Sequence, residues 1–210
     1  MKENSELEVR VLRRHSSSSA PFSKRLNGVK MITGKGVRLR SLERKDLPIF
    51  VEWLNDPEVR ENITRYSPLS MVEEEEWFNE LMIRPVEEHP LAIEINLDNI
   101  WITIGNISFL NFDQHNRSAE LGIFIGEKRY WGKGYGGDAV CLLLRYGFMN
   151  LNLHRIYLRV NENNLRGINC YKKSGFIMEG RARKAQFLNG RYVDLCLMSI
   201  LNDEWQDREI

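Results

Sequence analysis

The sequence predicts a single domain of the α/β (α+β) class, with a mixed, mostly antiparallel central sheet and helices on both faces. Residues 91–125 contain three neighbouring β-prone segments with short connections, a pattern typical of an antiparallel meander. Segments with the apolar period of a helix lie before and after this meander. The dipeptide Asn189-Gly190 is a strong short-range signal of a further hairpin near the end of the chain.

Length and charge fit one domain with an N-terminal extension. The chain has 210 residues and a formal net charge of +1, and a typical domain has roughly 150 residues. Residues 1–30 carry seven basic and three acidic groups without apolar periodicity, so we expect a disordered basic arm. The alternatives are a transit peptide, which three glutamates disfavour, or an upstream extension of the reading frame. Residues 31–210 are then the folded domain.

The elements before the meander follow from local signals. Residues 37–42 alternate apolar and basic side chains, as a short strand does. Asp46 is suited to cap a helix, which we expect Asn55-Asp56-Pro57 to end. Residues 70–73 have the form of a capping box and predict an acidic helix that runs through Leu81.

The meander itself is predicted at residues 91–97, 100–110 and 118–125. Side chains along a strand alternate between its two faces. In the third strand one face therefore carries Ala119, Leu121, Ile123 and Ile125, and the other carries Glu120, Gly122 and Phe124.

Helices and strands alternate after the meander. A long apolar helix is expected at about 136–150 and a short helix at 164–173, which Gly175 ends. Strands are expected at 155–160, 181–188 and 191–200.

Several classes of function are excluded by composition. No apolar run reaches the roughly 18 residues of a membrane span, and the near-zero net charge disfavours a nucleic-acid coat. The histidines and cysteines lack metal-ligand spacing, so we expect no metal site. The three scattered cysteines indicate reduced thiols and a cytoplasmic protein.

A glycine-rich loop at residues 129–137 separates a predicted strand from a predicted helix. Alternate glycines let successive N–H groups turn inward, and the following helix adds the positive end of its dipole, so the loop can hold a pyrophosphate. Gly132, Gly134 and Gly137 also spell the dinucleotide pattern G-x-G-x-x-G. That pattern belongs to repeated βαβ units, which an antiparallel meander and a hairpin disfavour.

Two motifs resemble those of the GNAT superfamily of N-acetyltransferases. The loop fits the form Q/R-x-x-G-x-G/A through Arg129, Gly132 and Gly134. Further on, Asn164 is followed seven residues later by Tyr171 and then by K-x-x-G-F. The resemblance extends over roughly residues 35–205 and is greatest to the spermidine and the ribosomal-protein alanine acetyltransferase branches. Gly167 departs from it, because Ser or Ala often stands at that position, which puts a contact to the cofactor in doubt.

The resemblance implies direct transfer of an acetyl group from acetyl-CoA to a primary amine. It implies that the strand before the loop splays from the next strand, and that the N–H of Phe124 or Ile123 polarises the thioester carbonyl. The residues that it implies for the cofactor are Ile123, Phe124, Ile125, Arg129, Gly132, Lys133, Gly134, Tyr135, Gly136, Asn164 and Tyr171.

Two side chains are candidates for proton transfer. Tyr171 is the candidate acid, because a phenol is a proton donor at neutral pH. Glu120 is the candidate base, directly or through water, and the alternative is a structural carboxylate. The acidic segment 41–90 could attract a polycationic amine, or could simply be a solvated surface.

The acceptor is expected to be a polyamine or another small amine. The alternatives are a protein N-terminus, or a non-catalytic module that binds acyl-CoA. The resemblance also implies assembly into a homo-oligomer.

Overall fold

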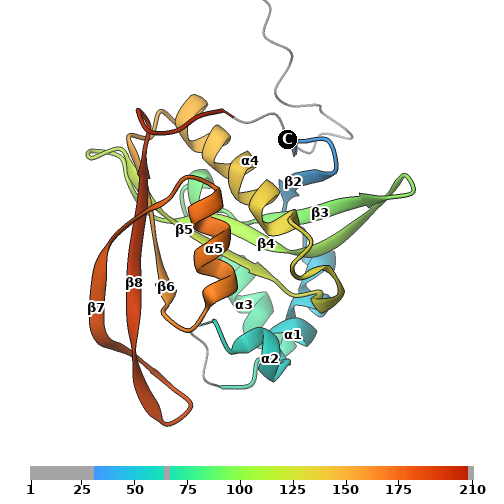
Figure 1. Cartoon of the computed structure of the whole chain (residues 1–210). Coiled ribbons are helices and arrows are strands. Elements are labelled where there is room, and N and C mark those ends of the chain that lie inside the picture. The colour runs from blue at the N-terminus through green and yellow to red at the C-terminus, as the bar shows by residue number, and fades with distance from the viewer. Residues whose placement is uncertain (1–30, 64–66, 208–210) are drawn as a thin grey trace, which may run out of the picture.

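The computed structural model describes residues 31–63 and 67–207; the predicted basic arm at 1–30 lies outside them. An eight-stranded sheet runs through the described part in the order β1-β2-β3-β4-β5-β6-β8-β7. Every neighbouring pair is antiparallel except β5 and β6 (Figure 1). The predicted mixed, mostly antiparallel sheet is confirmed. The strands are β1 (Met31–Thr33), β2 (Val37–Ser41), β3 (Leu91–Leu97), β4 (Ile100–Asp113), β5 (Ser118–Ile125), β6 (Arg155–Asn161), β7 (Ile177–Leu188) and β8 (Arg191–Leu201).

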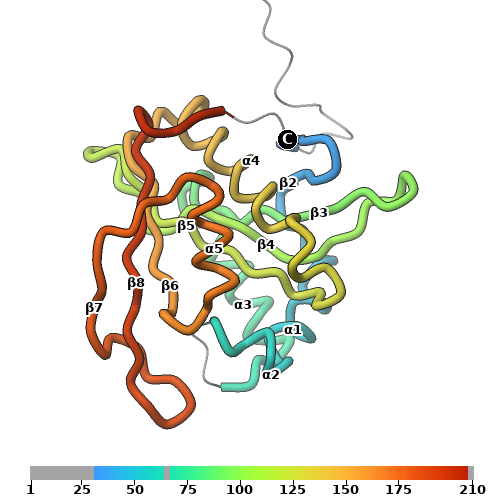
Figure 2. Tube along the Cα trace, in the orientation of Figure 1, coloured from blue at the N-terminus to red at the C-terminus, as the bar shows by residue number. Residues whose placement is uncertain are grey.

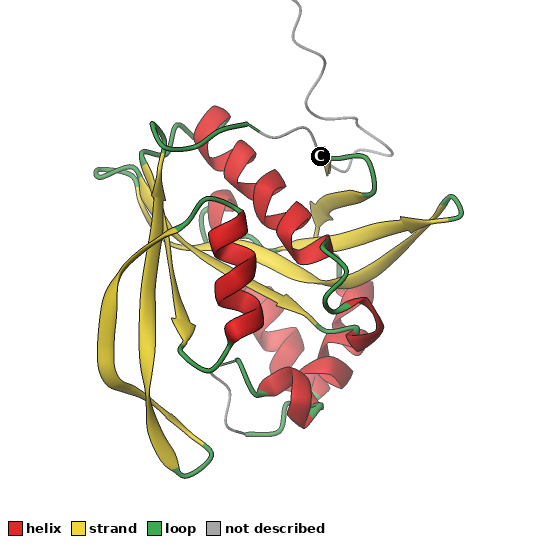
Figure 3. Cartoon of the chain, in the orientation of Figure 1, coloured by secondary structure: helices red, strands yellow, loops and turns green. Residues whose placement is uncertain are grey.

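The α-helices of the described part cover both faces of this sheet (Figure 3). They are α1 (Leu47–Asn55), α2 (Pro57–Arg60), α3 (Met71–Leu81), α4 (Tyr135–Met149) and α5 (Leu165–Lys173). One apolar core joins α4 to the sheet through Ala119 and Leu121, and the other joins α1 and α3 to it through Phe124. The predicted division of the third meander strand into two faces is therefore confirmed.

Helix boundaries follow the predicted caps with two exceptions. Asp46 precedes α1 as predicted, but its carboxylate makes no capping bond to that helix, because it is bound by the Arg40 guanidinium. The Ser70 hydroxyl accepts from the Glu73 N–H, and the Glu73 carboxylate accepts from the Ser70 N–H, so the capping box is formed. The prediction that Asn55-Asp56-Pro57 only ends a helix is incomplete. Asp56 ends α1 and also caps α2, whose first residue is Pro57. An aspartate and a proline suit both positions, so composition alone did not separate them.

Three strands differ by more than one residue from the sequence expectation. β1 was not predicted, β4 continues to Asp113, and β7 begins at Ile177. The predicted turn at Asn189 and Gly190 is confirmed, since both residues have positive φ. The hairpin of β7 and β8 extends past the ends of the neighbouring strands (Figure 2).

Candidate active site

The site is built on a gap in the middle of the sheet. β5 and β6 pair only over Ser118–Glu120 and Arg155–Tyr157, and beyond these residues the two strands separate. A cavity of about 1240 Å³ occupies the region of this gap. The separation of these two strands, which the family resemblance implied, is therefore present.

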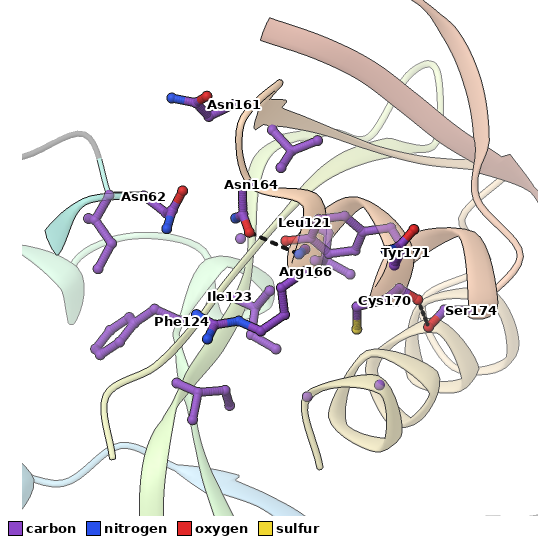
Figure 4. Close-up of a pocket in the computed structure, with 18 of the residues that line it drawn as sticks. Asn62, Leu121, Ile123, Phe124, Asn161, Asn164, Arg166, Cys170, Tyr171 and Ser174 are labelled. Carbon is purple, nitrogen blue, oxygen red and sulfur yellow. Dashed lines mark hydrogen bonds between the residues drawn. The ribbon is translucent and has the colours of Figure 1, made fainter. Parts of the chain in front are cut away.

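The cavity reaches both faces of the sheet. Its walls include Val59 and Asn62 from the side of α2, and Gly137 and Cys141 from α4. Figure 4 shows α5 contributing Tyr171 to the same cavity, with β5 between the two sides. Two molecules that approach from opposite faces can thus meet in the gap.

The hydrogen-bond alternation of β5 determines which backbone groups face the gap. The Gly126 N–H donates to the Ile104 carbonyl of β4 at 2.8 Å, whereas the Ile125 carbonyl accepts from the Trp131 indole at 2.7 Å. Since orientations alternate along an antiparallel strand, the Ile123 N–H points into the gap and the Phe124 N–H points toward β4. Of the two predicted carbonyl-polarising donors, the geometry favours Ile123.

The glycine-rich loop lies at one end of the cavity. Gly132 and Gly134 have φ values of 73° and 94°, a left-handed conformation that glycine adopts readily. Both line the cavity, as does Gly136 in the first turn of α4. The first intrahelical bonds of α4 are made by the N–H groups of Gly137 and Asp138, so the preceding N–H groups remain for an anion.

Three predicted residues of this loop are not in the cavity wall. Arg129 is mostly exposed and pairs with Glu127 at 3.0 Å. The Lys133 ammonium lies 5.4 Å from the centre of the Tyr130 ring, and Tyr135 packs edge-on against the same ring. The two cations belong to the loop, but the cavity is lined by its glycines and not by the side chains of Arg129 and Lys133.

The candidate acid, Tyr171, lies at the wall of the cavity. It projects from α5, lines the cavity and packs edge-on against Phe176 with ring centres 5.8 Å apart. Burial raises the pKa of its phenol well above the ordinary value, with a smaller contribution from Cys170. The hydroxyl makes no hydrogen bond to any residue of 31–63 or 67–207, so its proton is available to a ligand.

Glu120 lies on β5 at the last position paired with β6. It is buried and also lines the cavity. Its carboxylate accepts from Arg159 Nε at 2.8 Å, from Arg159 Nη2 at 3.1 Å and from Asn111 Nδ2 at 2.8 Å. The candidate base is therefore already engaged in an ion pair.

Asn164 caps α5 through its side chain. Its Oδ1 accepts from the Gly167 N–H at 2.9 Å, and the residue also lines the cavity. A Cβ on residue 167 would lie 2.7 Å from Asn164 Nδ2, so the capping orientation requires glycine there. The departure from the family pattern at Gly167 thus determines where Asn164 points.

Comparison with known proteins agrees with this geometry. Residues 37–177 match the acetyltransferase (GNAT) domain. The chain belongs to the GNAT acetyltransferase family. It is an N-acetyltransferase whose acetyl donor is acetyl-CoA.

Several GNAT relatives match over most of their length. A spermidine N(1)-acetyltransferase of Vibrio cholerae is 34% identical over 173 residues, which cover 81% of this chain and 95% of the relative. An uncharacterised N-acetyltransferase, p20 of Bacillus licheniformis, is 32% identical over 80% of this chain and 93% of its own. The crystal structure of the Vibrio cholerae spermidine N-acetyltransferase with CoA and spermine has a TM-score of 0.74 and 31% identity, over 80% of this chain and 97% of that one.

This GNAT site also contains residues that sequence reasoning did not select. Arg166 stacks 3.9 Å from the centre of the Trp131 ring, and both line the cavity (Figure 4 shows Arg166). For Arg159 the sequence predicts only a place in the strand at 155–160. The alternation of Arg155, Tyr157 and Arg159 placed all three on one face, but nothing local indicated that Glu120 would be opposite.

The described residues show neither a metal site nor a membrane-spanning helix. No group of three or more His, Cys, Asp or Glu suited to a metal ion occurs in residues 31–63 and 67–207. No helix in the same part of the chain is long and apolar enough to span a membrane.

Proposed function

We propose that this chain acetylates a primary amine of a polyamine, by direct attack of the amine on the thioester of acetyl-CoA in the cytoplasm. The observation that carries the proposal is the cavity through the sheet, which has a proton donor, Tyr171, and a carboxylate, Glu120, on its walls. Three free cysteines fit a reducing compartment.

The residues around the gap fit acetyl-CoA. The N–H groups of the glycine loop and of the first turn of α4 would hold the pyrophosphate. Arg129 and Lys133 belong to the loop and would add positive charge from outside the cavity. The N–H of Ile123 would donate to the thioester carbonyl and stabilise negative charge that develops on its oxygen. When bound, acetyl-CoA supplies the activated acyl group.

Two side chains would move the protons. An amine must lose its proton before it can attack, and Glu120 would accept that proton directly or through a water molecule. Tyr171 would donate its phenolic proton toward the departing sulfur. Because burial raises the pKa of Tyr171, the phenol stays protonated throughout the neutral range.

Cys170 supports direct transfer over an acyl-enzyme. It lines the cavity, but burial raises the pKa of its thiol to about 11, with smaller contributions from Cys141 and Asp138. A thiol is a good nucleophile only as the thiolate, which this environment disfavours at neutral pH.

A polycationic acceptor is supported by the relatives. Glu58 and Glu61 line a second cavity of about 310 Å³, which shares Asn62 and Trp131 with the first, but Arg166 and Arg191 line it too and balance their charge. Glu58 also pairs with Lys128 at 3.1 Å. The acidic turn at 73–76 lines neither cavity, so only part of the acidic segment is positioned to attract the acceptor.

The test is thiol release from acetyl-CoA with three classes of acceptor. Spermidine, a monoamine of similar length and a peptide with a free N-terminal alanine are compared at pH 7.5. We expect kcat/KM to be highest for spermidine. Preference for the peptide would replace the polyamine with a protein N-terminus. Binding of CoA without turnover of any acceptor would support the non-catalytic alternative.

A further inference from the structure

The ion pair between Glu120 and Arg159 crosses the gap where β5 and β6 begin to separate. Glu120 is in register with Tyr157, and Arg159 follows two residues later on the same face of β6. The guanidinium contacts both carboxylate oxygens, at 2.8 and 3.1 Å, and both residues line the cavity. The ion pair therefore stands beside the space that an acceptor amine must enter.

The two partners differ in freedom of movement. The Glu120 side chain is 8% exposed, whereas the Arg159 side chain is 55% exposed. Asn111 holds Glu120 by an independent hydrogen bond of 2.8 Å, and Arg159 has no second carboxylate partner in residues 31–63 and 67–207. Arg159 can thus turn into solvent at small cost while the carboxylate stays in place.

The same pair opposes the role proposed for Glu120. While the guanidinium bonds both oxygens of the carboxylate, these oxygens are less available to an entering amine. A cationic amine that enters the gap needs that carboxylate as its counter-charge. Besides Arg159, the Glu120 carboxylate contacts the uncharged side-chain amide of Asn111 on β4.

We infer that Arg159 is a positioning residue that holds the Glu120 carboxylate in place in the free enzyme, and that the ammonium group of the acceptor displaces Arg159 from it. This inference rests on the proposed function, because it takes the acceptor to be cationic. It assigns Arg159 a part in specificity, since an acceptor without positive charge would leave the ion pair intact.

The first test is a double-mutant cycle on the KM for spermidine, with saturating acetyl-CoA at pH 8. Arg159→Gln should lower this KM roughly fivefold, because an exposed ion pair contributes up to about 1 kcal/mol. In the Glu120→Gln background, Arg159→Gln should leave KM unchanged. Arg155→Gln is the matched control. Arg155 lies on the same strand as Arg159, but its ion pair is with Glu179 and lies away from the cavity. Its KM should equal that of the wild type.

Two outcomes would overturn the inference. One is an unchanged or higher KM in folded Arg159→Gln. The other is an equal decrease of KM in the Glu120→Gln background, which would indicate simple charge repulsion between Arg159 and the amine.

A second test does not depend on turnover. The 15N signal of Arg159 Nε, assigned by its loss in Arg159→Gln, is followed as spermidine is added to the complex with CoA. The signal should move toward its position in Glu120→Gln without spermidine, because displacement breaks the same hydrogen bond to the Glu120 carboxylate. A signal that stays in place while spermidine binds would overturn the displacement even if the chain acetylates no amine, so failure of the proposed function and failure of this inference are distinguishable.

Discussion

At the scale of single residues, the proposed mechanism depends most on the phenol of Tyr171. We predict that Tyr171→Phe lowers kcat about 100-fold with little change in the KM for acetyl-CoA, because a positioned general acid contributes at least that factor. The raised pKa of the wild-type phenol also predicts no loss of its donor function below about pH 10. Steady-state rates between pH 6 and 10 measure both effects.

Tyr146→Phe is a suitable control for that substitution. Burial raises the pKa of Tyr146 as well, but this side chain lies on α4 and does not line the cavity. Its kcat should stay close to that of the wild type. A wild-type rate for Tyr171→Phe at every pH would exclude Tyr171 as the acid.

Gly167 sets the orientation of a second residue of the site, Asn164. We predict that Asn164→Ala costs about 1 kcal/mol of unfolding free energy in the wild type, which is typical for loss of an N-cap. In the Gly167→Ala background the same change should cost almost nothing, because the added Cβ, 2.7 Å from Asn164 Nδ2, already displaces the cap. Urea unfolding of the four proteins measures the coupling.

Asn164→Asp retains a capping oxygen and should keep the wild-type stability. If Asn164→Ala costs the same in both backgrounds, the cap does not depend on glycine at position 167.

At the scale of elements, signals within a few residues of one another were predictable from the sequence. Three features that depend only on neighbouring residues are present as predicted. They are the capping box of α3, the hairpin turn at Asn189 and the glycines of the glycine-rich loop. The partners of Glu120 were not predictable, because Asn111 and Arg159 come from different strands, nine and 39 residues away. The sequence also did not predict that the Arg129 side chain lies outside the cavity, because its exposure depends on how the loop packs.

The loop before α4 gives a prediction at this scale. Gly134 has a φ of 94° and open space around its Cβ position, so a side chain would be resisted by backbone strain and not by a clash. Such strain costs on the order of 1–3 kcal/mol. We therefore expect Gly134→Val to raise the KM for acetyl-CoA at least tenfold with a smaller change in kcat.

Gly180→Val is the control for the loop, since Gly180 also has open space but no positive φ. Its KM for acetyl-CoA should equal that of the wild type. An unaffected KM in Gly134→Val would remove the loop from the cofactor site.

At the scale of the whole molecule, the sheet separates two sides that the site then connects. α4 and α5 lie on the side of the glycine loop, and α1, α2 and α3 lie on the other. Strand β5 belongs to both apolar cores, so the Ile123 amide and the Glu120 carboxylate are held by one rigid element. The overall charge of +1 hides a related asymmetry, because residues 41–90, which form most of the α1–α3 side, carry five basic and 13 acidic groups.

This two-sided arrangement predicts the kinetic order of the reaction. If both substrates reach the gap from opposite faces, they can be bound at the same time. Double-reciprocal plots of rate against spermidine at several acetyl-CoA concentrations should then intersect. Cys170→Ala should keep kcat within about threefold of the wild type. The reason is that the buried thiol, with its pKa near 11, takes no part in transfer. Parallel lines together with loss of activity in Cys170→Ala would indicate an acyl-enzyme on Cys170 instead, since that route releases CoA before the amine binds.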